Sequence, residues 1–281
     1  MKIKISSSFS GVISRGSYEN SRPGFSAEVE YDIEEGASVD VAVDSLQKRL
    51  QKICYDNFKA CEEQAIIERI NKERQDFRFY PDEYGKLILP SVTSVIGFDA
   101  DMFCTPEDLA QYAAQSNLCH AQVAHYIETG NWLEAKDVPG TWADLVIVTK
   151  GKLKLETNGW DFPAFLKKYP IKDAKNTRAS INLEHRYGGT PDFEGIPDFE
   201  GAEKVPTLFD VKRTPDKIKN NKQLAAYSKM KGYEHIKQIC IVPLNNKTQQ
   251  GFSKPMVETR IDQYFDMFLK DREAFKKRFG I

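Results

Sequence analysis

The sequence lacks a strong excess of charge of either sign. Its 40 Lys and Arg residues nearly balance 41 Asp and Glu residues, giving a formal net charge of −1 over 281 residues. A chain without an excess of positive charge has no overall electrostatic attraction for nucleic acid. Such a partner would have to be bound through a local basic patch or through metal ions. One candidate patch is the group of eight Lys and Arg residues between positions 212 and 237, although a solvated helix face is the alternative.

Long apolar runs are also missing. No stretch approaches the roughly 18 residues that a membrane-spanning helix needs. The opening MKIKISSSFSG lacks the apolar core of a signal peptide. We therefore expect no membrane partner and a cytoplasmic location.

Cysteine is scarce and irregularly spaced. The five cysteines, at positions 54, 61, 104, 119 and 240, form no Cys-x-x-Cys pair. Their odd number and spacing argue against a disulfide framework or a zinc site and indicate reduced thiols. Because Cys240 lies in the apolar run ICIVPL and Cys54 and Cys61 share a helix face, we also predict no iron–sulfur cluster.

Hydrophobic patterning predicts an α/β fold in two parts. Residues 2–12 and 24–33 have strand-like composition. Apolar residues then recur every three or four positions from about 40 to 74, which indicates a long amphipathic helix. We interpret residues 1–78 as a small N-terminal ββα appendage and residues 79–281 as the main domain.

The main domain is predicted to be a central mixed β-sheet flanked by helices. Thr105-Pro106-Glu107 is typical of a helix start, and that helix should end before Gly130. An order of β-β-β-α-β follows, which suits such a sheet. Its elements are ASINLEHRY, a GGTP turn, DFEGI, TLFDVKRT, a helix over about 216–231 and IKQICIVPL, with mixed structure expected at 141–157 and a closing helix in MVETRIDQYFDMFLKDREAFKKRF.

Acidic residues cluster in GGTPDFEGIPDFEG (188–201), just before the strand TLFDVKRT (207–214). Because side chains i and i+2 of a strand share a face, Asp210 and Lys212 should project together. Alone, that pair would most often be a surface ion pair. Asp192, on the preceding predicted strand, can however lie beside Asp210, and two such carboxylates suit a hard cation such as Mg²⁺ or Mn²⁺.

The predicted helix that follows carries Gln223 and Tyr227, which are four residues apart and so lie on one face. A bound cation would lower the pKa of a water molecule, and a neighbouring lysine would offset charge that develops in the transition state. Gln223 and Tyr227 could then hold the phosphate of the scissile strand.

The run GGTPD … FDVK … QLAAY resembles the PD-(D/E)XK nuclease superfamily, specifically its RecB-like exonuclease branch, which includes phage recombination nucleases. That branch has the pattern Gly-x-x-Asp, Asp-x-Lys and Gln-x-x-x-Tyr, matched here by 189–192, 210–212 and 223–227. LPSVTSVI and YAAQSNLCHAQVAHYIETGNW are similar to the entry segment and the histidine-bearing helix of such enzymes. The resemblance covers about residues 85–270 and implies a restriction-endonuclease-like core.

The resemblance also implies a set of site residues. The metal ligands would be His120, Asp192, Asp210, the backbone carbonyl of Val211 and, as an outer ligand, Glu184; Lys212 would be the catalytic lysine, with Gln223 and Tyr227 in support. Ser116 and Ala124 depart from the glycine and glutamate usual around that histidine. A packed or solvent-facing histidine therefore stays an alternative for His120, as does a surface glutamate for Glu184. His125 lies about 140° further around the helix and could not serve equivalently.

The pentapeptide PDFEG occurs twice, and only its first copy follows Gly-Gly. We therefore predict that Asp192 supplies the ligand and that Asp198, in the second copy, lies in a hairpin loop.

The function implied is a Mg²⁺- or Mn²⁺-dependent deoxyribonuclease, an exonuclease of replication, repair or recombination, located in the host cytoplasm if it is phage-encoded. Single- or double-stranded DNA would be its substrate, with a recombination or replication protein as a further partner. Two alternatives stay open. One is a structure- or sequence-specific endonuclease on the same fold, and the other is a non-catalytic nucleic-acid-binding protein on an inactivated nuclease fold.

Overall fold

The computed structural model describes residues 2–10, 13–14, 20–21, 23–32, 39–74, 77–82, 88–99, 105–138, 160–245 and 248–281. The chain divides into two compact units, one of Met1–Leu89 with Phe275–Ile281 and one of Pro90–Ala274. The predicted boundary after residue 78 falls inside the first unit. The mixed structure expected at 141–157 lies outside the described residues.

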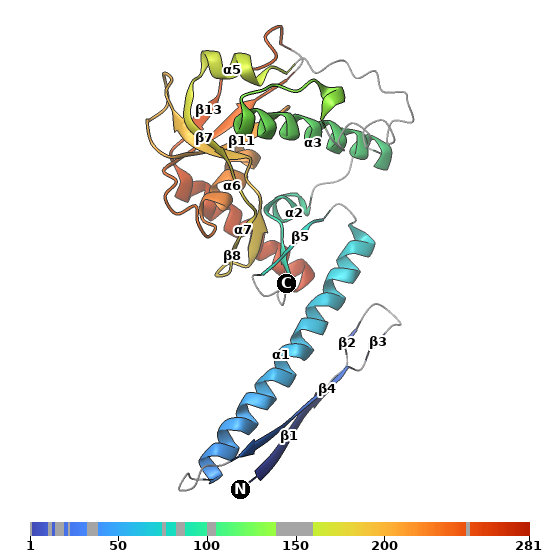
Figure 1. The fold of residues 1–281 in the computed structure, drawn as a ribbon. Helices are drawn as coiled ribbons and strands as arrows, with labels where there is room; N and C mark the ends of the chain where they lie inside the picture. The colour runs from blue at the N-terminus through green and yellow to red at the C-terminus, as the bar shows by residue number, and fades with distance from the viewer. Residues whose placement is uncertain are drawn as a thin grey trace. The chain divides into compact units, whose positions relative to one another are not determined.

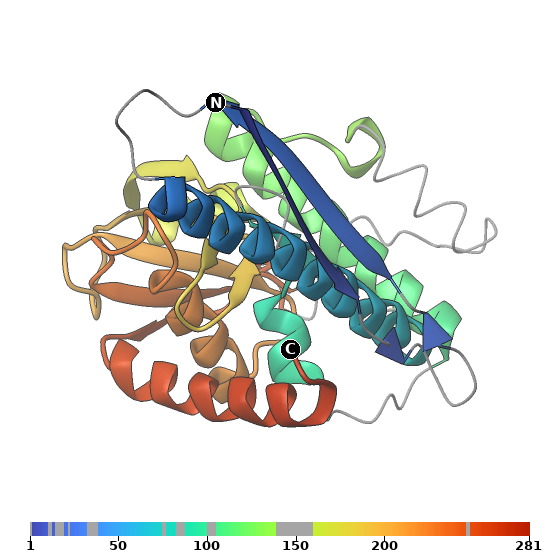
Figure 2. The same ribbon diagram turned by 90° about the horizontal axis from the view of Figure 1, so that it is seen from below.

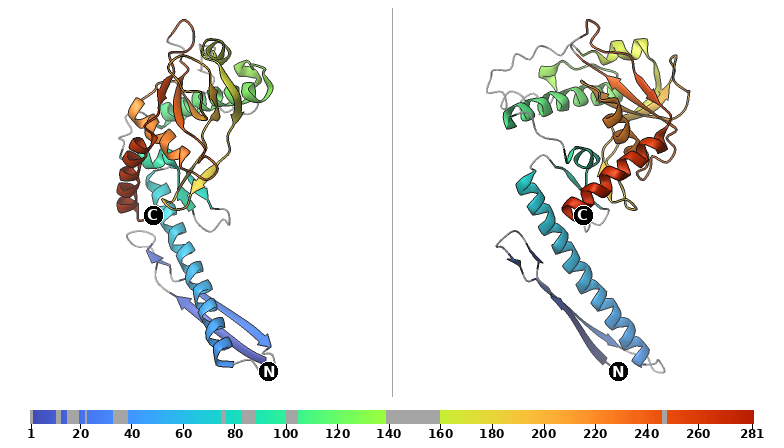
Figure 3. Two further views of the ribbon diagram at one scale, coloured as in Figure 1. Left: turned by 90° about the vertical axis from the view of Figure 1, so that its left-hand side faces the viewer. Right: turned by 180° about the vertical axis from the view of Figure 1, so that it is seen from behind.

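The first unit is a long hairpin packed along one helix (Figure 1). Strands β1 (Lys2–Ser10) and β4 (Gly24–Asp32) pair antiparallel, and α1 (Val39–Glu73) runs beside both, as Figure 3 also shows. Phe9 packs edge-on against Phe58 of α1 at 5.0 Å between ring centroids. The two strands and the helix predicted for this region are confirmed.

Short pieces complete the first unit. Strands β2 (Ile13–Ser14) and β3 (Asn20–Ser21) pair with each other, as do β5 (Phe79–Pro81) and β6 (Ile88–Pro90). Phe77 contacts the rings of Phe275 and Phe279 near the C-terminus. These contacts join the last residues of the chain to the first unit.

The second unit is built on a five-stranded mixed sheet in the order β13-β12-β11-β10-β7. Neighbouring strands are antiparallel except for β11 and β12, which are parallel because α6 (Lys217–Ser228) connects them. The predicted mixed sheet is therefore confirmed. Its strands are β7 (Ile171–Asn176), β10 (Phe193–Pro197), β11 (Thr207–Lys212), β12 (Gln238–Pro243) and β13 (Met256–Glu258).

Helices cover both faces of this sheet (Figures 1 and 2). Helices α3 (Pro106–Thr129) and α5 (Phe162–Lys168) share a core with sheet residues such as Phe193 and Phe209, and η1 (Ala135–Asp137) adds to it. Helix α6 contacts β11 and β12, and its Lys222 pairs with Asp271 of α7 (Ile261–Phe279). Within the described part of the chain, no helix has the length and apolarity needed to cross a membrane.

The segment predicted as the strand ASINLEHRY is instead a small separate hairpin. Strands β8 (Ser180–Asn182) and β9 (Tyr187–Gly189) pair outside the main sheet. The turn between them is closed where His185 N donates to Asn182 Oδ1 at 2.8 Å, a typical Asn turn. Gly188 and Gly189 consequently lie within β9, so the prediction that they form a turn was wrong.

Among the other elements that the sequence did not predict are β7, β13 and α2 (Val92–Gly97). Strand β7 is mostly exposed and charged, so it lacks the apolar alternation of a strand. Strand β13 is only three residues long and falls within the segment predicted as the closing helix. Helix α2 contains valine, threonine and isoleucine, which favour strands; Ser91 caps it by accepting from Ser94 N at 3.0 Å.

Candidate active site

Asp210 and Lys212 lie at the carboxyl end of β11 and face the same side of the sheet. Lys212 Nζ is 2.7 Å from Asp210 Oδ2, and the two side chains are 22% and 3% exposed. Phe209 and Val211, which alternate with them, are buried in the core beneath α3 and α5. The predicted alternation of charged and core side chains along this strand is confirmed.

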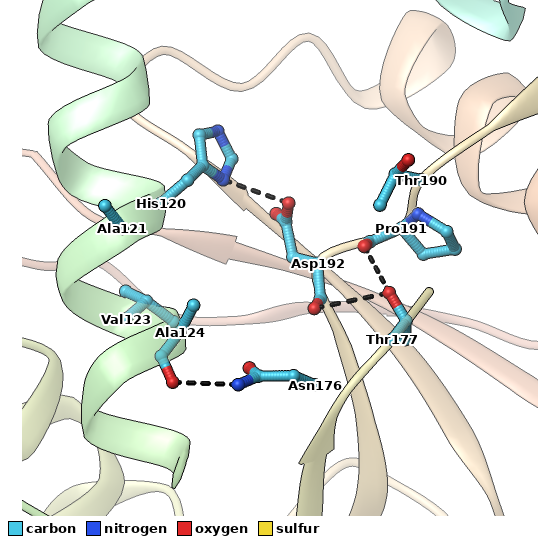
Figure 4. A pocket seen from close by; sticks show the side chains of 9 residues that line it. All are labelled: His120, Ala121, Val123, Ala124, Asn176, Thr177, Thr190, Pro191 and Asp192. Atoms are coloured by element: carbon cyan, nitrogen blue, oxygen red, sulfur yellow. Dashed lines mark hydrogen bonds and ion pairs between the residues drawn. The ribbon is translucent and has the colours of Figure 1, made fainter. Parts of the chain in front are cut away.

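The carboxylate of Asp192 contacts both β11 and α3. Its Oδ2 accepts a hydrogen bond from Val211 N at 2.6 Å, and its Oδ1 is 3.0 Å from His120 Nδ1. Its backbone is fixed as well, because Thr177 N donates to Asp192 O at 3.3 Å and Thr177 Oγ1 donates to Pro191 O. Figure 4 shows the contact of Asp192 with His120 and those of the Thr177 hydroxyl with the carbonyl oxygens of Pro191 and Asp192. The fold thus holds one carboxylate between two elements that are far apart in sequence.

His120 projects from α3 toward Asp192 (Figure 4). The structure therefore brings together four of the predicted residues: His120, Asp192, Asp210 and Lys212. Val211, predicted to contribute its backbone carbonyl, contacts the cluster through its amide N–H, and the carbonyl ligand stays a prediction. His125 is not among the residues that line the pocket beside His120.

The four charged groups perturb one another. Burial raises the pKa of Asp210 to about 6, with Asp192 adding to the increase and Lys212 opposing it. Burial also disfavours ionisation of Asp192, yet the charge of His120, with Lys212 and the Val211 amide, holds its pKa below the usual range. The pKa of Lys212 is raised despite burial, because of Asp210 and Asp192. The cluster is therefore one electrostatic unit.

Gln223 and Tyr227 are buried and hydrogen-bonded to each other. Gln223 Nε2 donates to Tyr227 OH at 3.0 Å. A Cβ placed on Gly189 would come within 2.2 Å of Tyr227 Cε1, so the tyrosine ring occupies the space above this glycine. The Gln-x-x-x-Tyr and Gly-x-x-Asp patterns thus meet in a direct contact, three residues before Asp192.

Glu184 does not join the cluster. It lies in the exposed turn between β8 and β9, its side chain is 83% exposed, and its carboxylate is 3.8 Å from His185. The outer-ligand interpretation assumed one continuous strand entering the Gly-Gly pair, and that strand does not exist. Asp198 does lie in the loop after β10, where it pairs with Lys172 at 2.7 Å and Lys204 at 2.5 Å.

The donor set of the cluster fits a divalent cation. Within the described ranges, no three or more His, Cys, Asp or Glu side chains form a ready-made metal group. However, Asp210 Oδ2 and His120 Nδ1 are buried, and each has a charged neighbour, Lys212 Nζ at 2.7 Å and Asp192 Oδ1 at 3.0 Å. Buried polar atoms need such partners. A cation that takes carboxylate oxygens and an imidazole nitrogen would satisfy them.

Two neighbouring features were not found from the sequence. A pocket of about 340 Å³ opens beside His120 and Asp192 and includes Asn176 and Thr177 in its lining (Figure 4). These two residues carry no motif and become visible only once β7 is located. In addition, Arg213 donates to Gln115 of α3 and lies 5.4 Å from the ring centroid of Trp160.

Comparison with known proteins adds no assignment. No protein-family model matches the chain, and no curated protein matches it. The candidate site is therefore assessed from its own residues and geometry.

Proposed function

We propose that this chain is a Mg²⁺- or Mn²⁺-dependent nuclease of the PD-(D/E)XK kind that hydrolyses phosphodiester bonds of DNA. The observation that carries the proposal is the gathering of His120, Asp192, Asp210 and Lys212, from three separate elements, into one coupled cluster. An ordinary surface ion pair would not bury Asp210 to 3% exposure. Isolated buried charges are disfavoured unless they have a role or a partner.

Each residue has a distinct task in this proposal. Asp192, Asp210 and His120 would hold the cation, which when bound polarises the phosphate and lowers the pKa of a water molecule. Lys212 Nζ would offset the negative charge that grows on the phosphate oxygens. In the reaction, the water would give up a proton to solvent as its oxygen bonds to phosphorus, the phosphorus–oxygen bond to the leaving nucleoside would break, and the leaving oxygen would take up a proton from solvent.

Gln223 and Tyr227 would act as positioning residues. Their contact with Gly189 supports the chain just before Asp192, and their bond to each other fixes the ring. The restriction-endonuclease-like core is also part of the proposal. It is supported by the succession of three antiparallel strands, the connecting helix α6 and the parallel strand β12.

An inactivated nuclease that only binds nucleic acid is the second candidate. One observation favours it: His120 pairs with Asp192 and Lys212 pairs with Asp210, so the cluster is charge-balanced without a cation. In that case the four residues would be a structural network.

A digestion assay distinguishes these candidates. Purified protein is incubated with end-labelled linear DNA, single- and double-stranded, and with covalently closed circles, in Mg²⁺, Mn²⁺ or a chelator. We expect cation-dependent release of nucleotides from linear DNA, and a loss of about 10²–10³ in rate for Lys212→Ala. Cutting of closed circles would identify an endonuclease. No cleavage of any substrate with either cation, together with DNA binding, would identify the inactivated alternative.

A further inference from the structure

The pocket beside His120 and Asp192 shares those two residues with the proposed cation site. Its volume of about 340 Å³ lies at the lower end of the roughly 300–1,000 Å³ typical of small-molecule pockets. It has room for one compact organic group. Anything bound there must lie directly against the proposed metal ligands.

The walls of the pocket come from two sides of the fold. Helix α3 supplies Ala121, Val123 and Ala124, and the segment before Asp192 supplies Pro191 (Figure 4). These short apolar side chains leave space and present carbon surfaces. The short side chain of Ala124 leaves part of this space open.

The polar groups of the pocket lie opposite α3. Asn176 Nδ2 donates to Ala124 O at 2.9 Å, and a carbonyl can only accept, so the amide orientation is fixed. Asn176 Oδ1 is then the acceptor that this side chain can offer to a ligand. Thr177 already donates to Pro191 O, which holds the rim in place. Apart from His120, the α3 side of the pocket is thus apolar, and the opposite side carries the hydrogen-bonding groups of Asn176, Thr177 and Asp192.

We infer that this pocket binds the nucleoside of the nucleotide that adjoins the scissile phosphate. The inference rests on the proposed function and extends it by assigning a site for base and sugar. With a phosphate at the cation site, its own nucleoside is the nearest organic group and reaches the adjoining pocket. Carbon walls suit a base or deoxyribose, and the Asn176 acceptor suits a base N–H or a sugar hydroxyl.

The test uses three probes, namely thymidine 5′-monophosphate, thymidine and inorganic phosphate, each titrated into the full-length protein with Mg²⁺ by calorimetry. We expect the nucleotide to bind at least tenfold more tightly than phosphate. Ala124→Phe should fill the pocket and remove that advantage while leaving binding of inorganic phosphate unchanged. Ala113→Phe, at an exposed position on the same helix, is the matched control and should behave as wild type.

A second variant tests the inference if Ala124→Phe does not fold. Asn176→Ala, at an exposed position, removes one hydrogen-bonding group and should weaken nucleotide binding about two- to tenfold. Equal affinity for phosphate and the nucleotide, or unchanged nucleotide binding in Ala124→Phe, would overturn the inference even if the protein cleaves DNA. Conversely, selective nucleotide binding by a protein that cleaves no DNA would support the nucleoside assignment of the pocket and refute the proposed nuclease activity.

Discussion

The contact between Gly189 and Tyr227 predicts that Gly189→Ala will destabilise the second unit. A new methyl group would lie 2.2 Å from Tyr227 Cε1, 3.0 Å from Cδ1 and 3.2 Å from Cζ. Contact distances between carbon atoms are about 3.5–4.0 Å. The ring cannot easily yield, because Tyr227 is only 4% exposed and its hydroxyl is bonded to Gln223.

The size of the effect follows from overpacking alone. The backbone at Gly189 has no positive φ, so alanine is strained there only by its neighbours. Extra methylene groups in a packed core typically cost about 1–3 kcal/mol. For a domain of 150–250 residues, each kcal/mol lowers Tm by about 2–4 °C. We therefore expect a loss of at least 2 °C and up to about 12 °C.

The assay is thermal unfolding followed by circular dichroism, with a double-mutant cycle. Tyr227→Ala removes the ring and is itself destabilising, since a large buried side chain is lost. In that background Gly189→Ala should cost much less than in wild type. Gly97→Ala is the matched control, because a Cβ at Gly97 would meet no atom within 4 Å.

Two results would refute this reasoning. The first is a Gly189→Ala protein as stable as Gly97→Ala. The second is an equal cost of Gly189→Ala with and without the Tyr227 ring, which would mean that the glycine is required for a reason other than this contact.

Three further predictions concern the site and the fold. Asp192→Ala should lower cleavage by about 10²–10³, whereas Asp198→Ala, in the loop after β10, should cleave like wild type; the reverse ranking would move the ligand to the second PDFEG. His120→Ala should raise the cation concentration for half-maximal cleavage, with excess Mn²⁺ restoring more activity than excess Mg²⁺; an unchanged midpoint would remove His120 from the ligands. Hydrogen bonds from Arg260 lower the pKa of Glu258 from 4.5 to about 2, so its contribution to stability is complete above about pH 4.5 and disappears as the pH falls toward 2. The Tm difference between wild type and Glu258→Gln should therefore be larger at pH 6 than at pH 2.5, and equal differences would contradict this.

The site could be predicted from sequence where local patterns carry its geometry. A strand alternates its side chains, so FDVK alone places Asp210 and Lys212 on one face and Phe209 and Val211 on the other. The Thr105-Pro106-Glu107 start and the glycine stop likewise predicted the bounds of α3, and Gly130 has a positive φ of 74°, which favours glycine at such a stop. Both predictions depend only on residues that are close together in the sequence.

The rest depends on contacts between distant segments. Gly-Gly is typical of turns, and nothing near it in sequence shows that Gly189 needs its small size for Tyr227, 38 positions later. The charged strand β7 is stable because β10 pairs with it, not because of its own pattern. Without β7, neither Asn176 nor the pocket could be foreseen, and Glu184 was assigned to a strand that does not form.

Substitution of Lys212 gives the clearest difference between the results expected for an active nuclease and for an inactivated one. Its ammonium lies 2.7 Å from Asp210 Oδ2, one of the two carboxylate oxygens that Asp210 can offer to a cation. If a cation binds there, Lys212 must move away and would then repel it. Lys212→Ala should therefore bind Mn²⁺ more tightly than wild type, by calorimetry, and yet cleave DNA more slowly. A purely structural ion pair predicts the opposite, because loss of the lysine would leave Asp210 buried without a partner and favour its protonated form. Weaker Mn²⁺ binding by a folded Lys212→Ala protein would thus count against the metal site itself.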